Sequence, residues 1–133
     1  MLYAEMMDQE RIMVAEAFGL KLGTSLDDLR RLYPKEQGDS LHDFLTYSKV
    51  HGGRGANAPD SLCHRYLIED VANGLVPLSN LGDLVNIPTP TVDSIIHLSA
   101  VINGVDYFQI GRNLEVLGFL GMSPEEIIKY VKE

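Results

Sequence analysis

The segment HRYLIEDVANGLVPLSNLG, residues 64–82, decides how the chain folds. Its apolar residues recur with helical spacing, which predicts a central helix from about Ser61 to Gly74 and a short helical turn over 77–86. Three charged residues interrupt this apolar pattern: Arg65, Glu69 and Asp70. Because charge in an apolar helix needs a partner or a cleft, these three are the first candidates for a functional site.

Their positions on an ideal helix differ. At 100° per residue, Asp70 shares an apolar stripe with Cys63, Tyr66, Leu67 and Val71, whereas Arg65 and Glu69 lie on the opposite side. Periodicity leaves two interpretations open. In one, Arg65 and Glu69 form an ordinary i,i+4 ion pair and Asp70 accepts hydrogen bonds from a neighbouring helix N-terminus. In the other, the charges face a site that handles a charged substrate.

The rest of the sequence predicts an all-α protein. Cap residues, prolines and glycines divide it into short helical segments, and no period-two run is convincing as a strand. We expect six to eight helices in one domain, residues 1–133, with a loop over 51–59. Further helices are expected over 2–18, from Thr24 or Ser25 to Pro34, from Asp39 or Ser40 to about Val50, over 90–103 with Thr89 as N-cap, over 111–118, and from Pro124 with Ser123 as N-cap.

Composition excludes several classes of function. The net charge of −8 over 133 residues argues against binding nucleic acid or an anionic membrane, since both need a basic surface. No run approaches the roughly 20 apolar residues of a membrane span, and the N-terminus lacks a signal pattern. We therefore expect a soluble, cytoplasmic protein. The single cysteine, Cys63, excludes an internal disulfide, and no His/Cys spacing predicts a metal site.

Three segments together resemble a known family. They are residues 64–82, IPTPTVDSIIHLSAVINGVDY at 87–107 and GRNLEVLGFLGMS at 111–123. In this order they resemble the C-terminal helical domain of the NAD/NADP octopine/nopaline (opine) dehydrogenase family; residues 1–60 match more loosely. The resemblance implies a helical domain similar to the C-terminal domain of 6-phosphogluconate dehydrogenase. It also implies the family's reaction, an NAD(P)H-dependent reductive condensation of an amino acid with a 2-keto acid.

The resemblance also implies roles for the charged residues. Asp70 closes the family's Arg-Tyr-x-x-Glu-Asp motif and would be catalytic, orienting and charge-stabilising the family's catalytic histidine. Arg65 would bind a substrate carboxylate, for which its planar guanidinium is suited, and Glu69 would belong to the same substrate-binding motif. On an ideal helix Arg65 and Asp70 lie about 140° apart, so both serve one site only if the site wraps the helix or the helix is distorted.

The sequence departs from the family in two respects. It has no G-x-G-x-x-G, and GGRG at 52–55 is no substitute, so we expect no cofactor bound by this chain. It also has no His-Pro pair to supply the catalytic histidine. The chain is therefore expected to be inactive alone and to need its own nucleotide-binding domain or a partner subunit. The alternative is a free-standing helical module for dimerisation or protein interaction, without catalysis.

Three other features have a structural and a functional interpretation. Asp93 and His97, at i,i+4, are expected to form a surface or interface pair rather than a catalytic dyad. Asp106, Tyr107 and Arg112 are expected to fix a turn between helices. An apolar group on the first helix is expected in the core, with a homodimer or interdomain contact as the alternative; its members are Tyr3, Met6, Met7, Met13 and Phe18.

Overall fold

The computed structural model describes residues 2–50 and 59–132, and these are helical with no strand among them, which confirms the all-α prediction. The expected loop at 51–59 lies outside the described residues except for Pro59. The elements in chain order are α1 (Leu2–Ala17), α2 (Ser25–Leu32), α3 (Leu41–Tyr47), α4 (Arg65–Asp70), the π-helical turn η1 (Val71–Leu75), α5 (Val76–Leu84), α6 (Pro90–Asn103), α7 (Tyr107–Ile110) and α8 (Pro124–Tyr130).

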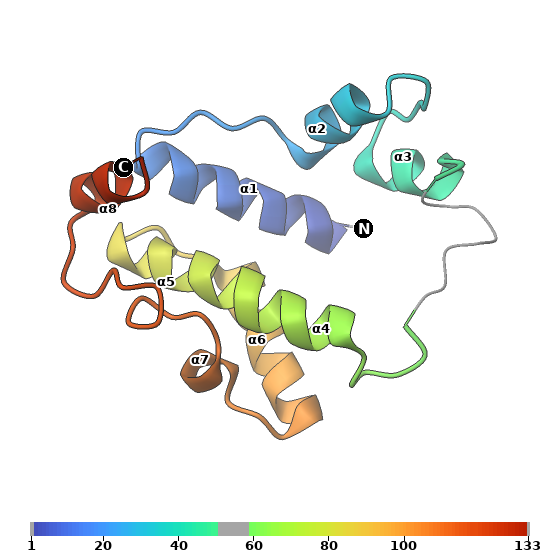
Figure 1. Ribbon diagram of the computed structural model, residues 1–133. Helices are drawn as coiled ribbons and strands as arrows, with labels where there is room; N and C mark the ends of the chain where they lie inside the picture. Colours follow the sequence, from blue (N-terminus) through green and yellow to red (C-terminus); the bar gives the residue numbers. More distant parts are fainter. Residues whose placement is uncertain (1, 51–58, 133) are drawn as a thin grey trace.

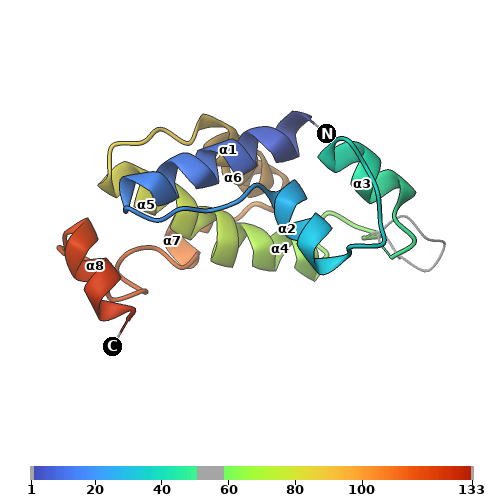
Figure 2. The same cartoon turned by 90° about the horizontal axis from the view of Figure 1, so that it is seen from above.

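The long helices form the centre of the molecule. α1 lies alongside the rod made by α4, η1 and α5, and α6 packs against α1, α5 and η1 (Figure 1). In both views α3 and α8 lie at opposite ends of this centre (Figure 2). Five side chains that are 0–1% exposed form the core between α6, α7 and the rod. They are Val71, Val76, Val92, Ile96 and Tyr107.

Most predicted helix ends are confirmed. Thr24 and Ser123 each form a capping box, in which the hydroxyl accepts from the N3 backbone N–H and the N3 carboxylate accepts from the N-cap backbone N–H. Ser40 caps α3 by accepting from the Asp43 N–H. Gly104, at φ +62°, ends α6 in the left-handed conformation that glycine adopts without a Cβ penalty. At these ends, short-range sequence signals are sufficient to place the helix boundary.

The central helix does not end at Gly74, where the sequence predicts its end. It continues through η1 into α5 and ends at Leu84. Pro77 lies inside this rod and has no backbone N–H to donate to the preceding turn. The rod accommodates Pro77 by widening over η1, where the Val76 N–H donates to the Val71 carbonyl five residues back. A proline that predicts a helix boundary instead produces a π-turn within one helix.

The predicted helix over 111–118 is also wrong. This segment is a series of turns, and the sequence does not predict the helical turn before it, α7. Gly118 and Gly121 have φ of +75° and +80°, which an α-helix does not accommodate. Asn113 caps only a single helical turn: its side chain accepts from the Val116 N–H and its carbonyl from the Leu117 N–H, and the left-handed Gly118 follows directly.

A buried glutamate joins the first and sixth helices. Glu10 on α1 is 5% exposed, and its two carboxylate oxygens accept from the backbone N–H groups of Thr91 (2.8 Å) and Val92 (3.0 Å). Thr89 is the N-cap residue of α6 but makes no side-chain cap bond. Glu10 therefore satisfies N–H groups that the first turn of a helix leaves free, and its charge complements the positive end of the helix dipole.

We expect Glu10→Ala to lower the free energy of unfolding by about 2–4 kcal/mol, because it leaves two buried N–H groups of α6 without an acceptor. Glu10→Gln keeps one acceptor oxygen and should cost less. Urea unfolding measures the difference. Glu16→Ala, at an exposed position on α1, is the control and should change stability by about 0.5 kcal/mol or less. Equal stability of the Glu10 and Glu16 variants would refute the cap.

Candidate functional site

α4 presents the predicted site residues at one end of the central rod. The helix begins at Arg65, with the His64 Nδ1 accepting from the Tyr66 N–H at 3.2 Å. The Arg65 guanidinium lies over the Tyr66 ring, 5.4 Å from its centroid. This is a cation–π contact between two exposed side chains.

Asp70 is exposed, which corrects the prediction that it lies in a buried apolar stripe. Of that stripe, only Leu67 and Val71 pack in the core, whereas Cys63 and Tyr66 are also exposed. The prediction assumes that this helix has a buried side, but no residue of α4 itself is buried. Because the Asp70 carboxylate is exposed to water, it does not need a buried hydrogen-bond partner.

The ordinary ion pair is also not formed. Within residues 2–50 and 59–132 the ion pairs are Arg11–Asp8 and Arg31–Asp28, and no side-chain hydrogen bond involves Arg65, Glu69 or Asp70. All three side chains are exposed. The structure thus places them along one short helix with their charges available to a ligand or to another part of the protein.

The other candidate pair, Asp93 and His97, is not hydrogen-bonded. Asp93 Oδ1 instead accepts from the Ser79 hydroxyl at 2.6 Å and the Thr89 hydroxyl at 3.2 Å, joining α6 to α5. His97 is exposed on α6. Asp93 therefore has a structural role. In the part of the chain that the structure describes, no three His, Cys, Asp or Glu side chains come together as a metal site.

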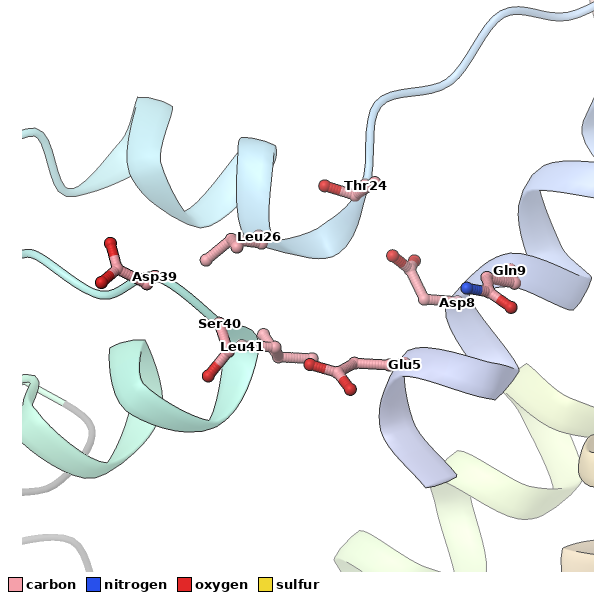
Figure 3. A pocket seen from close by; sticks show the side chains of 8 residues that line it. All are labelled: Glu5, Asp8, Gln9, Thr24, Leu26, Asp39, Ser40 and Leu41. Atoms are coloured by element: carbon pink, nitrogen blue, oxygen red, sulfur yellow. The ribbon is translucent and has the colours of Figure 1, made fainter. Parts of the chain in front are cut away.

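A small acidic pocket lies between α1, α2 and the start of α3, with a volume of about 290 Å³. Its residues are Glu5, Asp8, Gln9, Thr24, Leu26, Asp39, Ser40 and Leu41 (Figure 3). The carboxylates do not converge, since Asp39 lies on the far side of Leu26 from Asp8. This arrangement joins helices rather than enclosing a cation.

Asp8 holds α2 against α1. Its carboxylate accepts from the Ser25 backbone N–H at 2.7 Å, from the Ser25 hydroxyl at 2.6 Å and from Arg11 at 2.7 Å. Burial alone would raise the pKa of Asp8, but the hydrogen bonds from Ser25 and Arg11 and the charge of Arg11 outweigh it. The net effect is a pKa below the ordinary value of 3.8.

A second, larger pocket is mostly apolar. It has a volume of about 730 Å³ and lies between the start of α1 and α6. Tyr3 and Met6 line it from α1, and Ile95 and Leu98 are among its residues on α6. Tyr3 is 69% exposed, Met13 43% and Met6 41%, so the prediction that these three residues belong to the core is wrong, whereas Met7 packs against the core as expected.

No helix within residues 2–50 and 59–132 combines the length and apolar character that crossing a bilayer requires.

Cys63 is a free, exposed cysteine, and its thiol donates to Asn103 Oδ1 at 3.4 Å. The candidate site consists of the exposed charged residues around α4, which are Arg65, Glu69 and Asp70. We call them the charged face of α4, and they extend around the helix from Arg65 to Asp70.

Comparison with known proteins gives the class of this chain. Residues 2–103 match the model of the family described as NAD/NADP octopine/nopaline dehydrogenase, alpha-helical domain. The chain belongs to this family, as the resemblance of residues 64–123 suggests. The match includes α1 to α3, which resemble the family more loosely, and ends at the last residue of α6.

Individual relatives agree with this assignment. The chain is 37% identical to an opine dehydrogenase of Arthrobacter sp. (strain 1C) over 90% of its own length and 33% of that protein. It is 26% identical to a vitopine synthase of Allorhizobium ampelinum over 92% of its length and 33% of that protein. The chain thus spans about a third of the length of these relatives.

The charged face should contribute little to stability, because it makes no ion pair or side-chain hydrogen bond within the described residues. We expect Glu69→Gln and Asp70→Asn each to change the free energy of unfolding by about 0.5 kcal/mol or less. Urea unfolding is again the measurement. A loss of about 2 kcal/mol or more in either variant would mean that the face is a structural network.

Asp8 should make stability depend on acidic pH. A folded-state pKa lowered below 3.8 stabilises the fold above that value, and the stabilisation is lost as pH falls through the folded pKa. We expect Asp8→Asn to be less stable at neutral pH and to lose less stability between about pH 5 and pH 2. Unfolding at a series of pH values measures this. Asp60→Asn, at an exposed aspartate, is the control; matching pH profiles for the two variants would contradict the role of Asp8.

Proposed function

We propose that this chain is the substrate-binding and catalytic helical domain of an opine dehydrogenase-like oxidoreductase. The reaction class is the NAD(P)H-dependent reductive condensation of an amino acid with a 2-keto acid. The observation that supports this most directly is the charged face of α4, which is exposed, unpaired among the described residues and carried by a chain of this family. Charges without an ion pair or side-chain hydrogen bond are available to bind and act on charged substrates.

The proposed roles follow from the chemistry of each group. Arg65 offers a permanently charged, planar donor to a substrate carboxylate, and Glu69 extends the polar surface beside it. Asp70 orients a histidine and stabilises its protonated form. That histidine handles the proton at the substrate carbonyl oxygen while the amine adds and water leaves. Because Arg65 and Asp70 point to different sides of α4, the substrates would lie across the helix rather than on one edge.

The remaining parts of the site would come from outside these residues. The chain has no glycine-rich dinucleotide motif, so its residues do not fit a nicotinamide cofactor. NAD or NADP would supply the hydride from the protein's own nucleotide-binding domain or from a partner subunit, which would also supply the histidine. We further propose that residues 1–133 form one domain, similar to the C-terminal domain of 6-phosphogluconate dehydrogenase, in a cytoplasmic enzyme that is inactive without its cofactor domain.

A second candidate function is supported by the apolar pocket. Tyr3, Met6 and Leu98 are exposed and line this pocket of about 730 Å³ between α1 and α6, as an interaction or dimerisation module would require. On this alternative the chain associates with a second copy and catalyses nothing. Sedimentation at several concentrations separates the two: Leu98→Arg would abolish association if the pocket is the interface, whereas Asp70→Asn would leave association unchanged.

The proposed function predicts separate kinetic effects for two residues. In the protein joined to its cofactor domain, Asp70→Asn should lower kcat by about 10²–10⁴-fold, because the histidine loses its charged partner. Arg65→Ala should chiefly raise KM for the substrate whose carboxylate it binds, by about 10–100-fold. Steady-state kinetics with each substrate varied in turn measures both.

The control is Asp83→Asn, which changes an exposed aspartate on α5 of the same rod and should leave both constants unchanged. Near-normal turnover of Asp70→Asn would contradict the catalytic assignment. Unchanged kinetic constants for Arg65→Ala would remove that residue from the substrate site.

A further inference from the structure

The π-turn determines which side chains of α4 face solvent. In an uninterrupted α-helix, Glu69 would lie within about 20° of Val76, seven residues later, and Arg65 would lie on the same side. Val76 is completely buried, so a regular helix would place both charged residues on the side of the rod that is buried at Val76. Instead Val71 and Val76, five residues apart, are both buried, and Arg65 and Glu69 are exposed. The extra residue in η1 thus rotates Arg65 and Glu69 away from the side of the rod that is buried at Val76.

The π-turn is held by a segment that is distant in sequence. Since Pro77 has no N–H, the Ala72 carbonyl receives no donor from residue 77. The backbone N–H of Arg112 donates to it at 2.9 Å. This hydrogen bond satisfies a carbonyl of a buried residue and ties residues 111–112 to the turn that directly follows Asp70.

Gly111 makes this approach possible. A Cβ at this position would lie 2.6 Å from the Tyr107 carbonyl oxygen and 2.7 Å from the Ala72 carbonyl oxygen. The backbone at Gly111 has φ −76°, which every residue adopts, so lack of space and not conformation requires glycine. The Tyr107 side chain is 1% exposed, and its hydroxyl accepts from the Asn103 amide, which leaves this side of the contact little room to move.

We infer that Gly111 is a positioning residue for the charged face of α4, acting through the Arg112–Ala72 hydrogen bond and the π-turn. The inference rests on the proposed function, because the residues that Gly111 would orient are those to which that function gives a role. Gly111 and Arg112 lie beyond residues 2–103, which the family model matches.

The test compares two glycine substitutions in the enzyme joined to its cofactor domain. Gly111→Ala should displace residues 111–112 from the π-turn and lower kcat by about 10–100-fold, because small displacements of reacting groups have effects of this size. KM for the nicotinamide cofactor should not change. Gly82→Ala is the matched control: its Cβ would lie 2.8 Å from the Ile87 carbonyl oxygen, so it introduces a similar clash in the same rod, far from Asp70. It should destabilise the fold without changing kcat where both variants remain folded.

Backbone amide exchange provides a readout that is independent of activity. In Gly111→Ala the amides of Arg112 and of residues 71–76 should exchange at least about tenfold faster relative to the amides of α1, and in Gly82→Ala they should not. A normal kcat for Gly111→Ala, with Asp70→Asn inactive, would overturn this inference and leave the proposed function standing. Unchanged amide exchange would overturn it as well. Normal turnover of Asp70→Asn would instead overturn the proposed function, and this inference with it.

Should Gly111→Ala fail to fold, Pro77→Ala replaces it. This substitution restores a backbone N–H at residue 77, which can donate to the preceding turn, so the rod can form a regular α-helix. The Ala72 carbonyl then no longer needs the Arg112 N–H as its donor. A lower kcat with faster exchange at Arg112 is the expected result. Wild-type values for both would overturn the role assigned to the π-turn.

Discussion

The contact between Glu10 and the N-terminus of α6 is the interaction on which the rest of the structure depends. It joins Glu10 to two residues, Thr91 and Val92, that lie 81 and 82 positions later in the sequence. Each of the two carboxylate oxygens accepts one of the hydrogen bonds. Val92 is completely buried, so its N–H has no access to water and needs an acceptor from the protein. α6 in turn packs against α1, α5, η1 and α7. Fixing its first turn therefore fixes the helix that the central elements contact.

Two groups of carboxylates in this protein differ in their burial and in their hydrogen bonds. Glu10, Asp8 and Asp93 are wholly or partly buried, and each accepts hydrogen bonds that join one helix to another. Glu69 and Asp70 are exposed and make no such bond among the described residues. Because burying a charge without hydrogen-bond partners lowers the stability of the fold, the hydrogen bonds of the first group can be assigned to stability. The second group makes no such contact among the described residues, which is consistent with the substrate role that we propose for it.

Much of the fold is predictable from local signals. Thr24, Ser40 and Ser123 cap helices as their spacing indicates, and the helical period identifies the central rod. Pro77 is misleading, because whether a proline ends a helix or widens it depends on another segment supplying the missing donor. That donor is the N–H of Arg112, 40 positions from Ala72 in the chain, and local sequence patterns carry no information about it.

The sequence singles out Arg65, Glu69 and Asp70 as candidates, but it does not predict their setting in the structure. Helical periodicity places Asp70 in a buried stripe and suggests a helix N-terminus to satisfy it. The structure contains such a buried carboxylate, but it is Glu10. The sequence does not point to it, because Thr89 is predicted to cap α6 and only the structure shows that its hydroxyl donates to Asp93 instead. A first turn without its own cap needs an acceptor from elsewhere.

The central claim is that the exposed face of α4 handles the substrates. The most direct measurement is an NMR titration of the protein with a 2-keto acid, followed at the side chains and amides of assigned residues. Our account predicts saturable shifts at Arg65, Glu69 and Asp70, abolished by Arg65→Ala. Shifts confined to the apolar pocket around Tyr3 and Leu98, or shifts on α4 that survive Arg65→Ala, would contradict it.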